Sequence, residues 1–250
     1  MIAALERATL SALPAPRILF DGPFVVKAFL GGTGRANAAA SLDPAPDPDL
    51  AARVARIAAH YRRLGLRPRF RCSPLDPPGL EAHLRAAGWQ DADESLVTCG
   101  PTAPVAQADA AVEVLSAPDL EWLEVIGTVE YQSETRRAEK LEAVKLFAIP
   151  AAWLVLREEG RAIAAVSATC DGRFCGVFDL AVRPECRRRG LAQRMIGAAA
   201  HWGQAQGATH LFAQVAATNG ASRALQAGLG MLEQYRYTYF LTPTAGADAR

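Results

Sequence analysis

The chain has 250 residues, half of them hydrophobic and 21% charged, which allows a sizeable core and excludes bulk disorder. Its formal net charge of +1 gives no overall electrostatic reason to expect nucleic acid or an anionic membrane as a partner. The five cysteines contain no C-x-x-C pair, and neither a signal-peptide pattern nor a bilayer-length apolar run is present, so we expect a reduced, cytoplasmic protein without a zinc site or membrane anchor.

The first hundred residues predict one small module. Hydrophobic periodicity and turn residues predict strands over 24–30 and 36–42, a helix over 50–64, a strand over 67–72, a helix over 78–87 and a strand over 94–99. The glycine-rich segment 31–34 suggests a nucleotide loop at first sight. It lacks the lysine and spacing of a P-loop and the third glycine of a dinucleotide loop, so a hairpin turn is the favoured interpretation.

A small, polar, proline-containing stretch follows and predicts a linker. Beyond it the patterns predict a strand over 112–115, helices over 119–126 and 135–147, strands over 152–157, 162–169 and 174–182, a helix over 191–206, a strand over 211–215, a helix over 222–227 and a strand over 235–241. We therefore divide the chain into a first module at 1–100, a linker at 101–111 and a second module at 112–250.

The loop after the predicted strand over 174–182 has the features of a phosphate site. Gly190 precedes a helix, whose first-turn N–H groups have no intrahelical partner and whose dipole favours an anion there. Gly190 permits a backbone conformation that a Cβ forbids, and Ala192 leaves room for a pyrophosphate. Three arginines, Arg187, Arg188 and Arg189, can add charge-assisted hydrogen bonds of about 1.5–3 kcal/mol each. Arginines alone would indicate a solvated basic turn, whereas strand, glycine and helix in this order favour phosphate binding.

These residues carry a family resemblance. Arg187-x-x-Gly190-x-Ala192 resembles the Arg/Gln-x-x-Gly-x-Gly/Ala loop of the GNAT acyltransferase superfamily, which binds the pyrophosphate of acetyl-CoA. The segment Asn219-x-x-Ser222 with the Gly-Met pair at 230–231 resembles a second family motif, whose Asn and following helix line the same co-substrate. The predicted element order over 111–242 is also that of the family.

The first module resembles a degenerate GNAT module, because a proline- and aspartate-rich segment at 43–49 replaces the phosphate loop. The chain is therefore similar to the tandem-GNAT proteins. This resemblance implies an α/β (α+β) fold with a mixed central sheet flanked by helices in each half, and one co-substrate site per chain. It leaves open whether the halves pack on each other or on a second copy of the chain in a homodimer.

The resemblance also implies roles for individual residues. The co-substrate acetyl-CoA is expected to contact the backbone of the strand end, the loop and the second motif: Leu180, Ala181, Val182, Arg187, Arg188, Arg189, Gly190, Leu191, Ala192, Asn219 and Ser222. Gln226 stands where the family often has the tyrosine that protonates the leaving thiolate. The resemblance therefore supports acetyl-CoA binding by this chain more strongly than it supports the family's acid–base chemistry. Residues 130, 131, 134 and 136 fall where family members form part of the acceptor pocket.

Asp179 is the candidate catalytic residue. Strand alternation places it on the face of Ala181, opposite Leu180 and Val182. It can accept a proton from the acceptor amine if burial raises its pKa, or it can position the substrate ammonium or accept a structural hydrogen bond. Positioning the ammonium or accepting a structural hydrogen bond is favoured over accepting the proton.

The predicted activity is transfer of an acetyl group from acetyl-CoA to a primary amine on a small-molecule or peptide acceptor. A non-catalytic acyl-CoA-binding or sensing module is the alternative that the substitution at Gln226 and the degenerate first half favour. An O- or S-acyltransferase differs only in the acceptor, which the sequence does not identify.

Overall fold

The computed structural model describes residues 1–129 and 132–243. The first half contains α1 (Ile2–Ala12), β1 (Arg17–Asp21), β2 (Phe24–Ala28), the 3-10 turn η1 (Gly34–Ala36), β3 (Ala39–Ser41), α2 (Leu50–Arg63), β4 (Arg69–Cys72), α3 (Leu80–Ala86) and β5 (Gln90–Pro101). The second half contains β6 (Val112–Leu115), α4 (Leu120–Ile126), α5 (Glu134–Ala143), η2 (Val144–Leu146), β7 (Ala151–Glu158), β8 (Arg161–Asp171), β9 (Phe174–Val182), η3 (Pro184–Cys186), α6 (Leu191–Ala205), β10 (His210–Ala216), α7 (Gly220–Gly228) and β11 (Leu232–Leu241).

One continuous mixed sheet of eleven strands runs through both halves, in the order β1-β2-β3-β4-β11-β5-β10-β9-β8-β7-β6. The order is nearly palindromic, because α2-β4-α3-β5 in the first half repeats as α6-β10-α7-β11 in the second. The parallel pairs β3–β4 and β9–β10 occupy equivalent places in the two halves. The structure therefore has the predicted fold class, a mixed sheet with flanking helices in each half.

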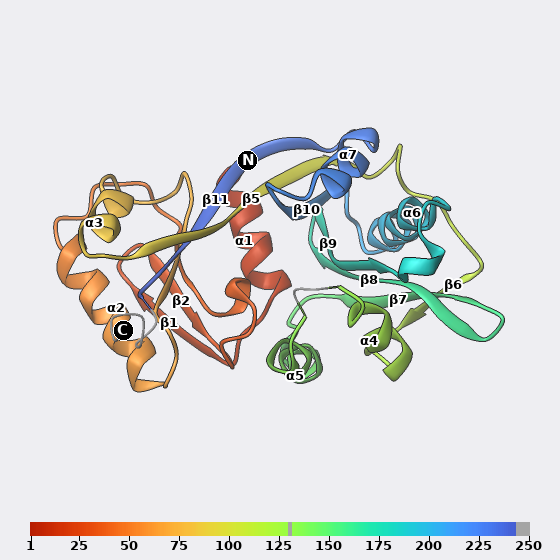
Figure 1. The fold of residues 1–250 in the computed structure, drawn as a ribbon. Helices are drawn as coiled ribbons and strands as arrows, with labels where there is room; N and C mark the ends of the chain where they lie inside the picture. Colours follow the sequence, from red (N-terminus) through yellow and green to blue (C-terminus); the bar gives the residue numbers. More distant parts are fainter. Residues whose placement is uncertain (130–131, 244–250) are drawn as a thin grey trace.

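The two halves exchange their last strands. β11 ends the second half yet pairs antiparallel with β4 of the first half, and β5 ends the first half yet pairs antiparallel with β10 of the second. β5 and β11 also pair with each other, and Figure 1 shows both strands running between the two lobes. The predicted linker packs on the second half, since Val105 is buried and Gln107 N donates to Gly197 O of α6 at 3.0 Å.

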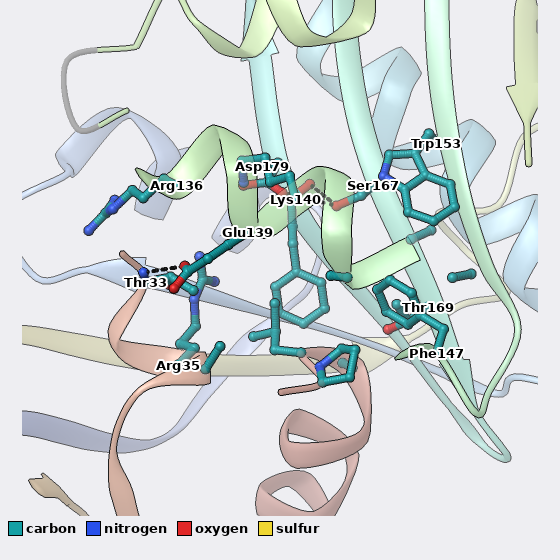
Figure 2. Close-up of a pocket in the computed structure, with 18 of the residues that line it drawn as sticks. Thr33, Arg35, Arg136, Glu139, Lys140, Phe147, Trp153, Ser167, Thr169 and Asp179 are labelled. Carbon is teal, nitrogen blue, oxygen red and sulfur yellow. Dashed lines mark hydrogen bonds and ion pairs between the residues drawn. The ribbon is translucent and has the colours of Figure 1, made fainter. Parts of the chain in front are cut away.

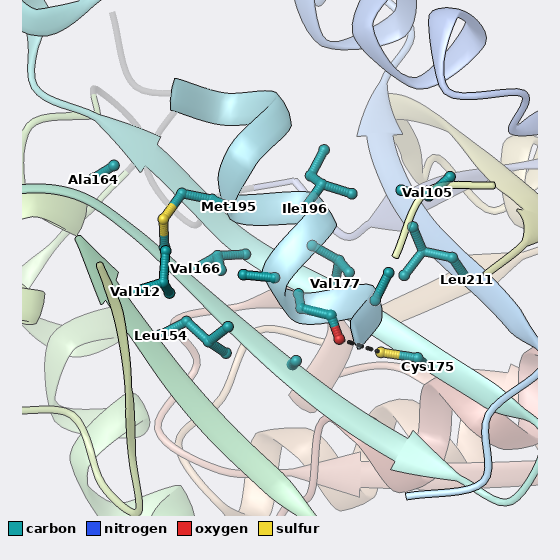
Figure 3. Packing of buried hydrophobic residues seen from close by; sticks show 14 of the residues in the cluster. Val105, Val112, Leu154, Ala164, Val166, Cys175, Val177, Met195, Ile196 and Leu211 are labelled. Atoms are coloured by element: carbon teal, nitrogen blue, oxygen red, sulfur yellow. Dashed lines mark hydrogen bonds between the residues drawn. The ribbon is translucent and has the colours of Figure 1, made fainter. Parts of the chain in front are cut away.

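The largest buried cluster lies between α6 and the sheet (Figure 3). Met195 and Ile196 of α6 pack over apolar residues of the neighbouring strands, among them Leu154, Val166 and Val177. The helix approaches the sheet closely at Gly203, where an added Cβ would lie 2.6 Å from the Cys175 sulfur. This packing fixes the N-terminus of α6 against the end of β9.

Helix α1 belongs to the first half in sequence but lies on strands of both halves. Its Leu5 and Ala8 share a buried cluster with Phe178 of β9. Glu6, also buried, accepts hydrogen bonds from Arg71 of β4 and Tyr235 of β11. The C-terminal end of α1 is thereby held next to the middle of the sheet, beside the cavity described below.

None of the helices within residues 1–129 and 132–243 combines the length and apolar character needed to cross a lipid bilayer.

Candidate functional site

A β-bulge interrupts β9 at Asp179. Phe178 lies opposite Ser167 of β8 and Ala181 lies opposite Ala165, so two residues of β9 face the single residue Val166. Asp179 has a φ of +56°, a backbone conformation that few residues other than glycine adopt. The extra residue places Phe178 and Asp179 side by side on one cavity, although plain alternation would separate them.

Just before the bulge, β9 leaves its neighbour β10. The parallel pairing of these strands ends at Val177 and Ala213, while β10 continues to Ala216 in its ladder with β5. Ala181 and Val182 stay paired with β8 on their other edge. Within the described residues, the edge of β9 toward β10 is therefore outside the sheet ladder along Leu180, Ala181 and Val182, as an added strand-like ligand would require.

The segment that follows forms an open turn at the N-terminus of α6. Arg188 and Gly190 have φ values of +64° and +73°, and Gly190 is the N-cap residue of the helix. A Cβ added at Gly190 would meet no atom within 4 Å, so neighbouring side chains do not fill the space. Backbone N–H groups around Leu191 and Ala192 lie in the first helical turn, where α-helices bind anions.

The three arginines of this turn have different surroundings. Arg189 forms a two-pronged ion pair with Glu158 of β7, at 2.7 and 3.0 Å. Arg187 Nε donates to the Val182 carbonyl at 3.3 Å, which holds its side chain along the end of β9. Arg187 and Arg188 are exposed. For Arg189 to bind the pyrophosphate as predicted, its guanidinium must either contact Glu158 and the pyrophosphate together or leave Glu158.

The second motif forms the start of α7. Asn219 is the N-cap residue, and its Oδ1 accepts a hydrogen bond from Ser222 N at 3.0 Å. Gln226 is buried, where it accepts from Thr98 Oγ1 at 2.7 Å and donates to Ser222 Oγ at 3.3 Å. Its amide therefore links α7 to β5, and does not line the cavity beside Asp179.

Asp179 is held in a polar cluster. One carboxylate oxygen lies 2.5 Å from Lys140 Nζ of α5, and the other accepts from Ser167 Oγ at 3.4 Å. Burial disfavours the charged carboxylate, but the ammonium of Lys140 and the guanidinium of Arg35 outweigh burial and hold the pKa of Asp179 below its ordinary value. This arrangement does not provide a proton acceptor with a burial-raised pKa, which is one of the three predicted roles of Asp179.

Asp179 opens onto a cavity of about 70 Å³ that both halves line. The first half supplies the end of α1, Phe29 and the Thr33–Ala36 turn, and the second half supplies α5, Phe147, Trp153 and the bulge (Figure 2). Arg136 lies in the predicted acceptor segment and lines the cavity, whereas residues 130 and 131 lie outside the described residues. Sequence reasoning missed the contributions of Arg35 and of the first half, which no local pattern signals.

A buried carboxylate on α5 binds the glycine-rich loop of the first half. The carboxylate of Glu139 accepts hydrogen bonds from the backbone N–H groups of Leu30, Gly32 and Thr33 at 3.1, 2.9 and 2.7 Å, and from Asn37 Nδ2 at 2.7 Å. The loop thus does bind an anion, one supplied by the chain itself. The helix predicted over 135–147 does not bury its side chains by polarity, because Glu139 is buried whereas Leu141 is 45% exposed.

Among the described residues, no group of three or more His, Cys, Asp or Glu side chains is arranged to hold a metal ion.

Comparison with known proteins identifies the family and the fold. The family model described as "Probable histone acetyltransferase Rv0428c C-terminal" matches residues 1–240. A search of curated protein sequences found no match.

Solved structures share the fold over nearly the whole chain. A GCN5-related N-acetyltransferase from Kribbella flavida is 17% identical with a TM-score of 0.72, over 98% of this chain and 96% of that one. A tandem GNAT protein from the clavulanic acid biosynthesis pathway is 13% identical with a TM-score of 0.65, over 98% and 89%. A conserved protein of unknown function from Staphylococcus epidermidis is 11% identical with a TM-score of 0.66, over 92% and 94%. The predicted tandem GNAT fold is confirmed.

Proposed function

The chain belongs to the acetyltransferase family described as "Probable histone acetyltransferase Rv0428c C-terminal", and we propose that it transfers the acetyl group of acetyl-CoA to a primary amine on a small-molecule or peptide acceptor. One observation carries the proposal. β9 leaves β10 after Val177 and leads into an open N–H turn at Gly190, while the bulge at the point of divergence presents Asp179 to a cavity. A co-substrate groove and an acceptor pocket therefore meet at one place on one strand.

The co-substrate is held mainly by backbone groups in this proposal. The pyrophosphate binds the N–H groups from Arg188 to Ala192, where the helix dipole adds to the hydrogen bonds, and Arg187 supplies a nearby positive charge. The pantetheine amides pair with the open edge of Leu180–Val182, as a strand would. Asn219 and Ser222 line the co-substrate through the start of α7.

The acceptor must reach the thioester as a neutral amine. Deprotonating a lysine-like amine at pH 7 costs about 4–5 kcal/mol, and an α-amino group about 1 kcal/mol. The amine nitrogen then bonds to the thioester carbonyl carbon, the C–S bond breaks, and the nitrogen releases its extra proton to water as the amide forms. CoA leaves as a thiolate that takes up a proton from solvent. Because neighbouring cations hold the pKa of Asp179 low, we assign it to binding and orienting the acceptor ammonium, with the proton passing to water.

Titration calorimetry with acetyl-CoA tests the co-substrate site. Gly190→Glu places a side chain and a negative charge in the proposed pyrophosphate position, so we expect affinity to fall by at least about tenfold. Gly65→Glu is the matched control, because Gly65 also has a positive φ and open surroundings but lies in the first half. Equal binding by wild type and Gly190→Glu refutes the proposed site.

A non-catalytic acyl-CoA sensor is the second candidate. It is favoured by the buried amide of Gln226, which is hydrogen-bonded to Thr98 and Ser222 and is too weak an acid to protonate a thiolate, and by the ion pair between Asp179 and Lys140. Thiol detection of released CoA across a library of amines separates the two functions. Acetyl-CoA binding without amine-dependent CoA release supports the sensor, and release in proportion to acetylated amine supports the transferase.

A further inference from the structure

The cavity beside Asp179 has an apolar body and one charged side. Its apolar lining includes Phe29 from the first half and the aromatic rings of Phe147, Trp153 and Phe178 from the second. The charged side chains come from α5, from the bulge of β9 and from the first-half turn, and Lys140 meets Asp179 where α5 approaches the bulge (Figure 2). A ligand that fits this cavity has a polar end at Asp179 and an apolar remainder.

The Asp179 carboxylate is already paired with an ammonium group of the chain, that of Lys140. Lys140 Nζ lies 2.5 Å from Asp179 Oδ1, and both side chains are largely buried, with 18% and 11% of their surface exposed. Figure 2 shows the two side chains directed toward each other at the edge of the cavity. A primary alkylammonium on a flexible arm therefore fits the pocket of Asp179, because Lys140 is such a group.

The charges that line the cavity limit the acceptor further. The lining contains three cationic side chains, of Arg35, Arg136 and Lys140, and two carboxylates, of Glu139 and Asp179. The Glu139 carboxylate accepts four N–H groups of the first half and is committed to that contact. Asp179 is thus the carboxylate at which an incoming ammonium is stabilised, and each further positive charge on the acceptor meets a net positive lining.

We infer that the acceptor ammonium displaces Lys140 from Asp179, and that the acceptor is a compact amine with one positive charge and an aromatic or aliphatic body. The inference rests on the transferase function proposed above and adds the substrate class. Lys140 then acts as a resident competitor, which lowers the affinity for amines and shields the carboxylate while the pocket lacks an acceptor. A lysine-rich peptide would place several positive charges against the same lining and is disfavoured.

Two variants of the full-length chain test the displacement. Lys140→Met removes the competing charge but keeps an unbranched side chain, so we expect phenethylamine to bind about 10- to 100-fold more tightly, the factor that corresponds to losing one charge-assisted hydrogen bond of the competitor. Lys140→Arg keeps the charge and should bind no more tightly than wild type. Lys145→Met is the matched control, since Lys145 is exposed and lies outside the cavity lining.

Binding is measured by titration calorimetry at pH 7 in the presence of CoA, and KM and kcat are measured by CoA release from acetyl-CoA. Hexylamine and 1,6-diaminohexane have the same six-carbon chain and differ only in a second amino group, so they test whether the acceptor carries one positive charge. The monoamine should bind several times more tightly. The pH profile of kcat/KM adds an independent readout, because removing the Lys140 charge should raise the apparent pKa of its acid limb.

The outcomes separate this inference from the proposed function. Tighter amine binding by Lys140→Met without CoA release from any variant supports the displacement and refutes the transferase. CoA release with the same amine KM in wild type and Lys140→Met supports the transferase and refutes the displacement. Weaker amine binding by Lys140→Met, absence of amine binding in every variant, or preference for the diamine also overturns the inference.

Discussion

The contact between Glu139 and the first-half loop should contribute strongly to stability. Glu139→Ala leaves the N–H groups of Leu30, Gly32 and Thr33 and the amide of Asn37 without their acceptor. Four hydrogen bonds to a charged group, at about 1.5–3 kcal/mol each, sum to about 6–12 kcal/mol. Gly32 and Thr33 are only half-buried, so water replaces part of this loss. We expect a destabilisation of about 3–5 kcal/mol, because each buried N–H donor left without an acceptor costs about 1–3 kcal/mol and water compensates the half-buried donors.

Urea unfolding followed by tryptophan fluorescence measures this loss. Glu142→Ala is the control on the same helix, because Glu142 is exposed, and it should cost less than about 0.5 kcal/mol. Glu139→Gln keeps one acceptor oxygen but directs an N–H group at a backbone donor, so it should fall between the two. If Glu139→Ala is as stable as Glu142→Ala, the loop does not depend on this carboxylate, and the reasoning about the contact between the halves is refuted.

Two further predictions concern pH. Burial lowers the pKa of Lys27, whose ammonium lies at the carbonyls of Leu10 and Leu13, to about 7, so the unfolded chain binds more protons between pH 7 and 10. The unfolding free energy should therefore rise over that range, by at most about 5 kcal/mol relative to Lys27→Met, and parallel urea-derived curves for the two proteins would contradict this. The pKa of Asp179 is lowered, so its contribution should persist above about pH 4 and decline as the pH falls further. The stability difference between wild type and Asp179→Asn should accordingly shrink from pH 7 to pH 3, and a constant difference would show that the Lys140 pair does not act on folding.

Local patterns predicted what depends on neighbours in sequence. The strand, glycine turn and helix around Gly190 form a contiguous unit, and the structure has each part in its predicted order. The order helix, strand, helix, strand, which occurs once in each half, was also predicted from the sequence, because each of these elements has its own hydrophobic periodicity. Asp179 lines a cavity with Trp153, which packs in the same buried cluster as Ala181, the neighbour that alternation predicts for it. The bulge that also brings Phe178 to this cavity has no sequence signature.

Contacts between distant segments could not be predicted in this way. A strand pattern such as that of β11 fits equally well beside strands of either half, so the exchange with β5 is decided by tertiary packing. From the sequence alone, Glu139 is expected to face solvent, because the groups that donate hydrogen bonds to it lie more than 100 positions away along the chain. For the same reason the ion pair of Lys140 with Asp179, across 39 positions, became visible only in the structure.

The exchange of strands makes the second half dependent on the first, although the predicted phosphate loop lies in the second half alone. Residues 112–250 expressed alone lack β5, which separates β10 from β11, and lack β4, the other neighbour of β11. The bare edge of β10 and the unpaired β11 would expose backbone donors and acceptors that favour aggregation. We expect this fragment to lack a cooperative thermal transition by circular dichroism, and co-expression with residues 1–111 to restore one. A monomeric 112–250 fragment that unfolds cooperatively and binds acetyl-CoA would show that the first half is dispensable for the fold, and would leave the cavity wall as its remaining role.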